Sequence, residues 1–261
     1  MQRIFHTPEG VRDIYSQECS RKQKLQEKLH RVFHQYGFED IETPTFEYFE
    51  VFSKEVGTIP SRELYKFFDR EGNTLVLRPD FTPSVSRACA TYFNPEKEVV
   101  SLCYTGNTFI NNSSFRGRLK ETTQMGVERM GDDSPEADAE ILAMTVECLL
   151  ATGLTEFQVS VGQVDYYKAI FAQTGLSQEE EEELRELISQ KNYFGVEELV
   201  KNKNMDKSLA RVLSQLPQMF GSTEVLEKAK SLTDNPQALK AVARLEEIYE
   251  LLKVYGYEKY V

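Results

Sequence analysis

No apolar run in the sequence approaches the roughly 20 consecutive apolar residues that a membrane-spanning helix requires. The first residues, MQRIFHTPEGVRD, also lack the apolar stretch of a secretory signal peptide. We therefore expect a protein without a membrane segment that stays in the cytoplasm.

Cysteine and histidine are both scarce. None of the four cysteines is in the C-x-x-C spacing typical of zinc and redox motifs, so we expect reduced thiols. These residues are Cys19, Cys89, Cys103 and Cys148. Among the three histidines, His30 and His34 are one helical turn apart, a spacing that can bind a metal. With His6 as the remaining histidine and no third ligand apparent, we expect a solvated helix face, no metal and no cofactor.

Positive charge is in the minority. The 31 Lys and Arg residues are outnumbered by 42 Asp and Glu residues, which gives a formal net charge of −11. Such a chain is repelled by phosphate backbones, so we expect no nucleic-acid partner. The hydrophobic content of 40% and charged content of 28% are typical of a folded globular protein.

The pattern of apolar residues predicts an α+β domain followed by a helical one. In the first part we expect helices at 16–36, 82–93 and 134–151 and strands at 38–44, 65–69, 74–78, 99–109, 119–130 and 154–161. From Asp165 onward only helical patterns remain, at 166–173, 177–190, 196–201, 207–216, 222–232 and 236–255. We place the domain boundary near Thr174, which gives domains 1–174 and 175–261.

One polar segment leaves a strand and enters a helix. Arg78, Asp80 and Thr82 are brought together there, at a helix N-terminus. A carboxylate can bind an ammonium group, while a hydroxyl and free N–H groups can bind an anion, so this segment could hold a zwitterion. The alternative is that Asp80 and Thr82 simply cap the helix, with Pro83 in its first turn.

A second polar segment is on an expected strand. Alternation places Gln124, Gly126 and Glu128 on one face, which leaves room for a small polar ligand or forms an ordinary solvent-facing surface. In the preceding loop, Arg116 and Arg118 could bind an anion such as phosphate, although an exposed turn is the favoured interpretation.

Four segments together resemble class II aminoacyl-tRNA synthetases, and histidyl-tRNA synthetase in particular. Residues 37–47 (GFEDIETPTFE) resemble motif 1, which builds the dimer of these enzymes, and residues 77–82 (LRPDFT) resemble an LRPE-x-T segment. Residues 108–128 resemble the motif 2 strand-loop-strand, and residues 8–13 resemble the N-terminal signature. The resemblance implies an antiparallel sheet flanked by helices, a helical insertion domain from about residue 175 and self-association as a dimer through the motif 1 region.

The sequence departs from the synthetases where ATP would bind. Their motif 2 continues as Phe-Arg-x-Glu, and that arginine holds the α-phosphate, whereas here Phe109 is followed by Ile110, Asn111 and Asn112. An isoleucine cannot stabilise charge that develops on phosphorus, and loss of such a cation typically costs several kcal/mol of barrier. The glycine-rich motif 3 and the anticodon-binding domain are not recognisable either. We expect that adenylation activity is lost.

The amino-acid half of the pocket is retained. By resemblance, Asp80, Thr82, Gln124 and Glu128 surround the α-amino group and neighbouring atoms of histidine. This combination is similar to the regulatory subunits of ATP phosphoribosyltransferase. Members of that family pair with a short-form catalytic subunit, as a histidine-responsive hetero-octamer, in the first step of histidine biosynthesis.

Two other interpretations remain open. One is a divergent histidyl-tRNA synthetase-like ligase that activates an amino acid, and the other is a dimerisation scaffold without a ligand. Because family chains continue beyond the position of Val261, we also expect the present chain to be a fragment.

Overall fold

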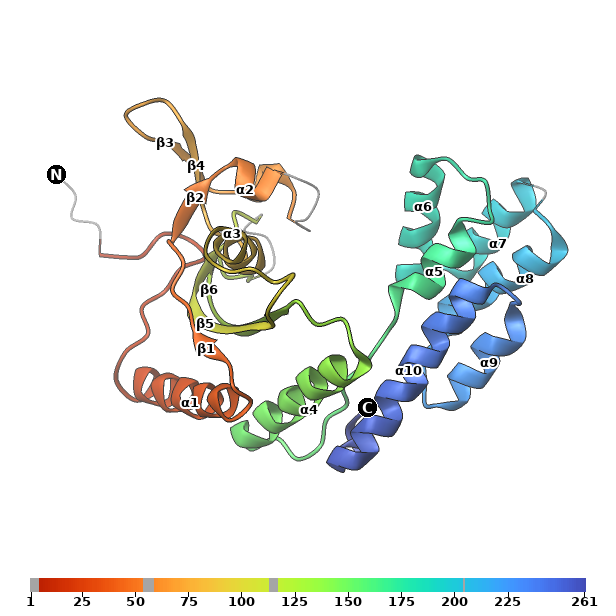
Figure 1. The fold of residues 1–261 in the computed structure, drawn as a ribbon. Helices are drawn as coiled ribbons and strands as arrows, with labels where there is room; N and C mark the ends of the chain where they lie inside the picture. Colours follow the sequence, from red (N-terminus) through yellow and green to blue (C-terminus); the bar gives the residue numbers. More distant parts are fainter. Residues whose placement is uncertain (1–4, 54–58, 113–116, 204) are drawn as a thin grey trace. The chain divides into compact units, whose positions relative to one another are not determined.

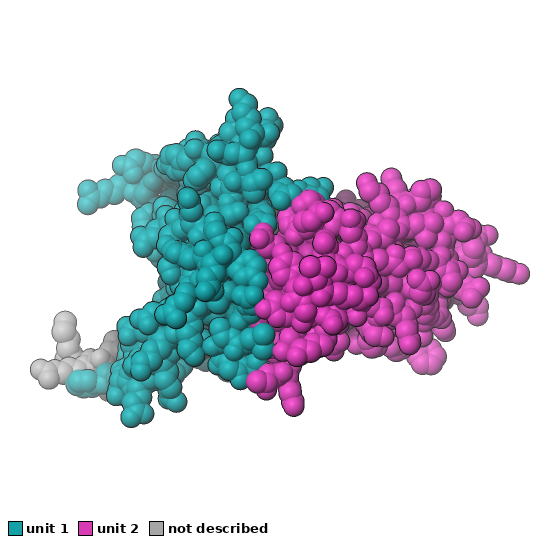
Figure 2. Space-filling view, turned by 60° about the horizontal axis from the view of Figure 1, so that its bottom comes forward, with its two compact units in different colours: residues 1–133, 147–154 teal, residues 134–146, 155–261 magenta. Residues whose placement is uncertain are grey.

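The structure, a computed structural model, describes residues 5–53, 59–112, 117–203 and 205–261. The chain divides into two compact units, coloured teal and magenta in Figure 2. Residues 1–133 and 147–154 form the first unit, and residues 134–146 and 155–261 form the second.

The elements follow one another as labelled in Figure 1. The helices are α1 (Ser16–Gln35), α2 (Glu50–Ser53), α3 (Thr82–Tyr92), α4 (Pro135–Thr152), α5 (Val164–Phe171), α6 (Gln178–Ser189), α7 (Tyr193–Asn202), α8 (Lys207–Gln215), α9 (Glu224–Leu232) and α10 (Pro236–Tyr255). The strands are β1 (Glu39–Asp40), β2 (Phe46–Tyr48), β3 (Lys66–Phe68), β4 (Thr74–Leu77), β5 (Val100–Phe109) and β6 (Glu121–Met130). Short 3-10 helices are η1 (Ser61–Glu63), η2 (Leu216–Gln218) and η3 (Glu258–Tyr260).

The described residues of the first unit form two three-stranded sheets, with strand orders β1-β5-β6 and β2-β4-β3. β5 and β6 are antiparallel along their whole length, from Val100 opposite Met130 to Phe109 opposite Glu121. β1, in contrast, runs parallel to β5. The expected α+β fold is confirmed, although the antiparallel sheet is divided into two and includes one parallel pair.

Helix α3 covers one face of β5 and β6 (Figure 1). Phe81, which directly precedes the helix, packs with Val85 and Cys89 of α3 against Leu102 and Tyr104 of β5. All five side chains are almost fully buried, so their contacts fix the start of α3 over the strands.

The strand expected at 38–44 is much shorter in the structure. Only Glu39 and Asp40 form β1, with Ile41 adding a backbone hydrogen bond to Cys103. Beyond that point the carbonyl groups of Thr43 and Pro44 accept hydrogen bonds from the Arg78 guanidinium. Because the Arg78 side chain, and not a neighbouring strand, donates to these carbonyl groups, the backbone pairing of β1 does not continue.

The second unit is helical around its own core. Its largest fully buried side chains include Ile170, Leu184 and Leu213, which come from α5, α6 and α8. The acidic start of α6 is held by a capping box, in which Ser177 and Glu180 each accept from the other's backbone N–H.

This division by packing differs from the expected boundary near Thr174. Tyr166, Ala169 and Ile170 of α5 belong to the core of the second unit, so the helical part begins earlier in the chain.

The strand expected at 154–161 was a wrong prediction. From residue 157 onward its side chains alternate between half-buried and exposed, but within the described part of the chain this segment pairs with no strand. The Val159 N–H instead donates to the Tyr260 carbonyl at 2.6 Å, and one such bond does not make a ladder.

None of the helices in the described part of the chain combines the length and apolar character needed to cross a bilayer.

Candidate functional site

A carboxylate on β6 lies against the start of α3. Glu128 Oε1 accepts a hydrogen bond from the Thr82 hydroxyl at 2.6 Å and a longer one from the Tyr104 hydroxyl at 3.5 Å. Thr82 comes from the first position of α3 and Tyr104 from β5, so three elements converge on one carboxylate.

Asp80 adds a second carboxylate beside this group. Its Oδ1 accepts a hydrogen bond from the backbone N–H of Phe81 at 2.7 Å. Burial, and then the negative charge of Asp80, raise the pKa of Glu128, which the hydrogen bonds from Thr82 and Tyr104 partly offset. Burial and the charges of Glu128 and Asp80 likewise raise the pKa of the Tyr104 phenol.

This electrostatic arrangement favours a cationic ligand. The Glu128 carboxylate, whose charged form is disfavoured by burial and by the charge of Asp80, is stabilised when a positive group lies beside it. An ammonium group has three N–H donors, and charge-assisted hydrogen bonds from it to carboxylates are among the stronger ones in proteins.

The capping interpretation of Thr82 is wrong. The N-cap of α3 is Phe81, Thr82 is already inside the helix, and no side-chain cap bond is present at this terminus. The Thr82 hydroxyl donates across to Glu128 instead. Asp80, one residue outside the cap, bonds the Phe81 N–H and keeps its other carboxylate oxygen for further contacts.

Gly126 makes room for Tyr104, a residue that the sequence analysis missed. The two residues are opposite each other in the β5–β6 pair. A Cβ at Gly126 would lie 2.5 Å from the Tyr104 Cζ, so any side chain there would displace the phenol from Glu128. A glycine opposite an aromatic residue in the expected strand pair is the signal that could have revealed it.

Gln124, the fourth expected ligand residue, is half-buried on β6 opposite Gly106 of β5. Alternation along β6 places it on the same face as Gly126 and Glu128.

Arg78 has a structural role that the sequence analysis did not anticipate. Its Nε donates to the Asn107 carbonyl and its Nη1 to the Thr43 carbonyl, each at 2.8 Å. The guanidinium also stacks on the Phe81 ring, 4.0 Å from the centroid, and Phe81 stacks in turn on Tyr104 at 4.2 Å. Burial lowers the pKa of Arg78, and backbone carbonyl groups accept hydrogen bonds from its Nε and Nη1.

The loop that contains the possible anion-binding residues, for which an exposed turn was the favoured interpretation, is only partly described. Arg116 lies outside the described residues, and Arg118 is exposed. At the base of the loop, Ile110 donates its backbone N–H to the Lys120 carbonyl at 2.9 Å. The half-buried Ile110 side chain offers no charge at the position where the synthetases carry arginine.

The sequence analysis excluded a metal because it identified no third ligand beside His30 and His34, and that premise was wrong. The structure brings two further donors, Asp40 and Cys103, to His30 and His34. They escaped the sequence analysis because Cys103 is far along the chain and reaches Asp40 only through the β1–β5 pairing.

Comparisons with known proteins agree on the relationship. The histidyl-tRNA synthetase family model matches residues 10–260. ATP phosphoribosyltransferase regulatory subunits from Acetivibrio thermocellus and Thermoanaerobacter pseudethanolicus are 41% and 38% identical over 98% and 99% of the chain. The chain spans 62% of the first relative and 67% of the second, so with the Acetivibrio protein it covers less than two thirds of the length.

Solved structures of related proteins have the same fold as this chain. A crystal structure from Bacillus halodurans, described as an ATP phosphoribosyltransferase regulatory subunit/histidyl-tRNA synthetase, superposes with a TM-score of 0.89 at 31% identity. The match covers 100% of this chain and 68% of that one. A histidyl-tRNA synthetase from Nostoc sp. PCC 7120 is similar in fold, with a TM-score of 0.76 at 19% identity over 98% of this chain and 59% of that chain. The chain therefore belongs to the histidyl-tRNA synthetase family, in the group of ATP phosphoribosyltransferase regulatory subunits.

Proposed function

We propose that this chain acts as the regulatory subunit of a short-form ATP phosphoribosyltransferase, in the first step of histidine biosynthesis, and that it senses histidine. The observation that carries the proposal is the identity of 35–41% to relatives of that name over 97–99% of the chain. In this role it is not itself an enzyme, and it works in the cytoplasm.

The histidine pocket is formed by Asp80, Thr82, Gln124 and Glu128. The α-ammonium group of histidine lies between the two carboxylates, where it offsets the burial of Glu128 and the repulsion from Asp80. The convergence of Thr82 and Tyr104 on Glu128, at 2.6 and 3.5 Å, supports this placement because it holds the carboxylate in position before a ligand arrives.

Histidine would control the partner by population shift. A ligand changes the balance between two conformations only by its difference in affinity for them. Contacts to both α3 and β6 supply such a difference, because any displacement of Thr82 relative to Glu128 changes the pocket.

The chain's own adenylation activity is proposed to be lost. Supporting this, Ile110 stands where the related synthetases hold the α-phosphate of ATP with arginine. The alternative, a divergent histidyl-tRNA synthetase-like ligase, is favoured by the name of the family model and by the second half of the description of the Bacillus halodurans structure. Histidine-dependent ATP–pyrophosphate exchange by the purified chain would support this alternative and contradict the loss of adenylation.

The proposed partners are the catalytic subunit, a second copy of this chain bound through the motif 1 region, and histidine, with no nucleic acid or membrane. The decisive experiment is size-exclusion chromatography with a short-form catalytic subunit, together with its turnover rate with and without histidine. We expect a joint peak and a rate that depends on histidine. Separate peaks and a rate unaffected by the chain would contradict the proposal.

The variant Glu128→Gln separates assembly from sensing. We expect it to co-elute with the catalytic subunit as the unmodified chain does, while the response to histidine is weakened. Glu121→Gln is a matched control, because Glu121 is on the same strand but accepts its hydrogen bond from Asn107, at 2.7 Å.

A further inference from the structure

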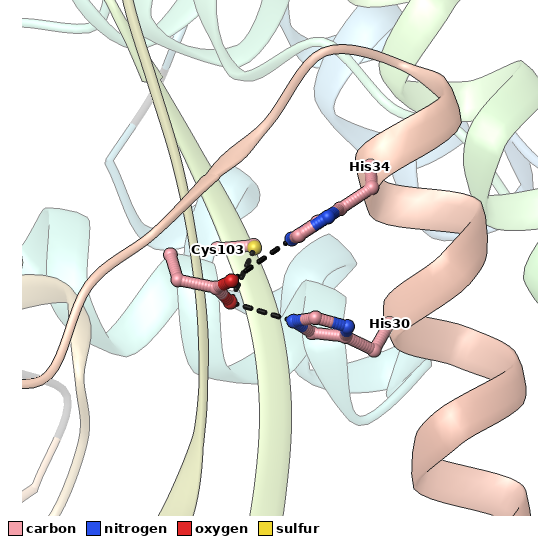
Figure 3. A group of neighbouring side chains, drawn as sticks. His30, His34 and Cys103 are labelled. Atoms are coloured by element: carbon pink, nitrogen blue, oxygen red, sulfur yellow. Dashed lines mark hydrogen bonds and ion pairs between the residues drawn. The ribbon is translucent and has the colours of Figure 1, made fainter.

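Two imidazoles project from successive turns of α1. His30 and His34 are four residues apart, so they lie on one face of the helix, and their ring centroids are 4.1 Å apart. Figure 3 shows both rings reaching toward the sulfur of Cys103 on β5. Three side chains from two distant parts of the sequence therefore meet at one point.

The backbone explains how the fourth donor arrives. Gly37 has a φ of +77° and reverses the chain after α1, so that β1 returns beside the helix. In the parallel β1–β5 pair, Asp40 is the register partner of Cys103. The pairing of these strands thus places a carboxylate and a thiol directly in front of the two imidazoles.

The four donor atoms are already close together. Asp40 Oδ1 is 2.7 Å from His30 Nε2, and Asp40 Oδ2 is 3.0 Å from His34 Nε2. The Cys103 thiol donates to Asp40 Oδ1 at 3.5 Å, and all the donor atoms lie within 4.8 Å of one another. Metal–ligand bonds of about 2.0–2.3 Å at tetrahedral angles require donors roughly 3.3–3.8 Å apart, so small side-chain rotations complete a tetrahedron.

We propose that His30, His34, Asp40 and Cys103 form a binding site for zinc or a similar divalent transition metal. Imidazole and thiolate ligands favour such ions over Mg²⁺ and Ca²⁺, which prefer oxygen. Four protein ligands close the coordination sphere, as in structural rather than catalytic zinc sites. The ion would tie α1 to both strands of the parallel pair.

An ordinary ion pair explains this arrangement less completely. Hydrogen bonds from the imidazoles suffice to stabilise the Asp40 carboxylate, but they give no reason for a thiol at the same point. The imidazoles and the carboxylate are partly exposed, whereas Cys103 is only 1% exposed. The site is therefore open to an ion on one side and closed by the sulfur on the other.

The test is a titration of the metal-free chain with Co²⁺, a spectroscopic substitute for Zn²⁺. We expect saturation at one ion per chain, with the absorption of tetrahedral cobalt and a thiolate-to-cobalt charge-transfer band. Zn²⁺ should displace the cobalt, whereas Mg²⁺ should not. Zn²⁺ should also raise the thermal unfolding midpoint, because an ion that binds only the folded chain stabilises it.

Matched variants identify the ligands. Loss of an outer partner alone typically costs about 10–100-fold in metal affinity, so His34→Ala and Asp40→Ala should each weaken binding at least about tenfold. Cys103→Ala should abolish the charge-transfer band. Since Cys103 is buried, the two exposed variants keep the test valid even if Cys103→Ala folds poorly. The controls His6→Ala and Cys148→Ala should bind as the unmodified chain does.

Two results would overturn the proposal. One is the absence of saturable Co²⁺ or Zn²⁺ binding by the unmodified chain. The other is affinity that stays within about twofold in both His34→Ala and Asp40→Ala. Neither result would bear on the proposed histidine pocket, whose residues are separate from these four.

Discussion

Neutralising Glu128 should weaken histidine binding without harming the fold. In Glu128→Gln the side chain keeps its shape and can still accept a hydrogen bond from Thr82, but it no longer carries the charge that attracts an ammonium group. A hydrogen bond to a charged group contributes about 1.5–3 kcal/mol. The variant should therefore bind histidine about 10- to 150-fold more weakly.

The same substitution should stabilise the fold of the unliganded chain, because it removes a buried negative charge. Folding raises the pKa of Glu128 above its ordinary value of 4.5, because the carboxylate is buried beside Asp80. A carboxyl group whose pKa is raised by folding favours the folded state at low pH and loses that contribution as pH rises through the folded value. The free energy of unfolding should thus fall with pH above about 4.5, and this component should be missing in Glu128→Gln.

Calorimetric titration with histidine measures the first effect, and urea unfolding at a series of pH values measures the second. Glu121→Gln, on the same strand, should bind histidine normally. The reasoning is refuted if Glu128→Gln binds as tightly as the unmodified chain, if Glu121→Gln loses as much affinity, or if the unmodified chain does not bind histidine at all.

Three further substitutions test packing, a buried charge and a helix cap. Gly126→Ala should cost about 1–3 kcal/mol in urea unfolding because its Cβ would overlap Tyr104, whereas Gly162→Ala, with open space around it, should not destabilise the chain. Arg87→Ala should cost about 1.5–3 kcal/mol because Glu47, only 7% exposed, loses hydrogen bonds of 2.8 and 3.0 Å. A loss no larger than that of Arg12→Ala, which breaks an exposed pair, would contradict this. Asn235→Ala should cost about 1–2 kcal/mol, since Asn235 caps α10 through Gln237 and Ala238. Thr223→Ala is its control, because the Thr223 side chain makes no cap bond to α9, and equal losses would refute the capping argument.

The sequence predicted the elements that depend on local signals. The helices at 16–36 and 236–255 are confirmed almost to the residue, because the pattern of apolar residues that predicts a helix is local. The strand at 154–161 failed because alternation is necessary for a strand but not sufficient. Val159 has the right pattern, and no strand in the described residues pairs with it.

The candidate site residues show the same difference between local signals and long-range pairing. Asp80, Thr82 and Glu128 were predicted from motifs, and their role as ligand residues stays a prediction. The hydrogen bond from Thr82 to Glu128 and the charge of Asp80 show that the three residues are neighbours. Tyr104 and Cys103 were not found, because each acquires its neighbours through strand register. No local pattern shows that Gly126 is opposite Tyr104 or that Asp40 is beside Cys103.

The stack of Arg78, Phe81 and Tyr104 gives the proposed pocket an optical probe. The chain contains no tryptophan, so tyrosine dominates its near-ultraviolet absorption and emission. Tyr104 lies flat against Phe81, with 9° between the rings, and its hydroxyl faces Glu128. A ligand that binds the Glu128 carboxylate changes the polarity around the Tyr104 phenol, which is held rigidly in an asymmetric environment. Occupancy of the proposed pocket should therefore be measurable by near-ultraviolet circular dichroism without attaching a label.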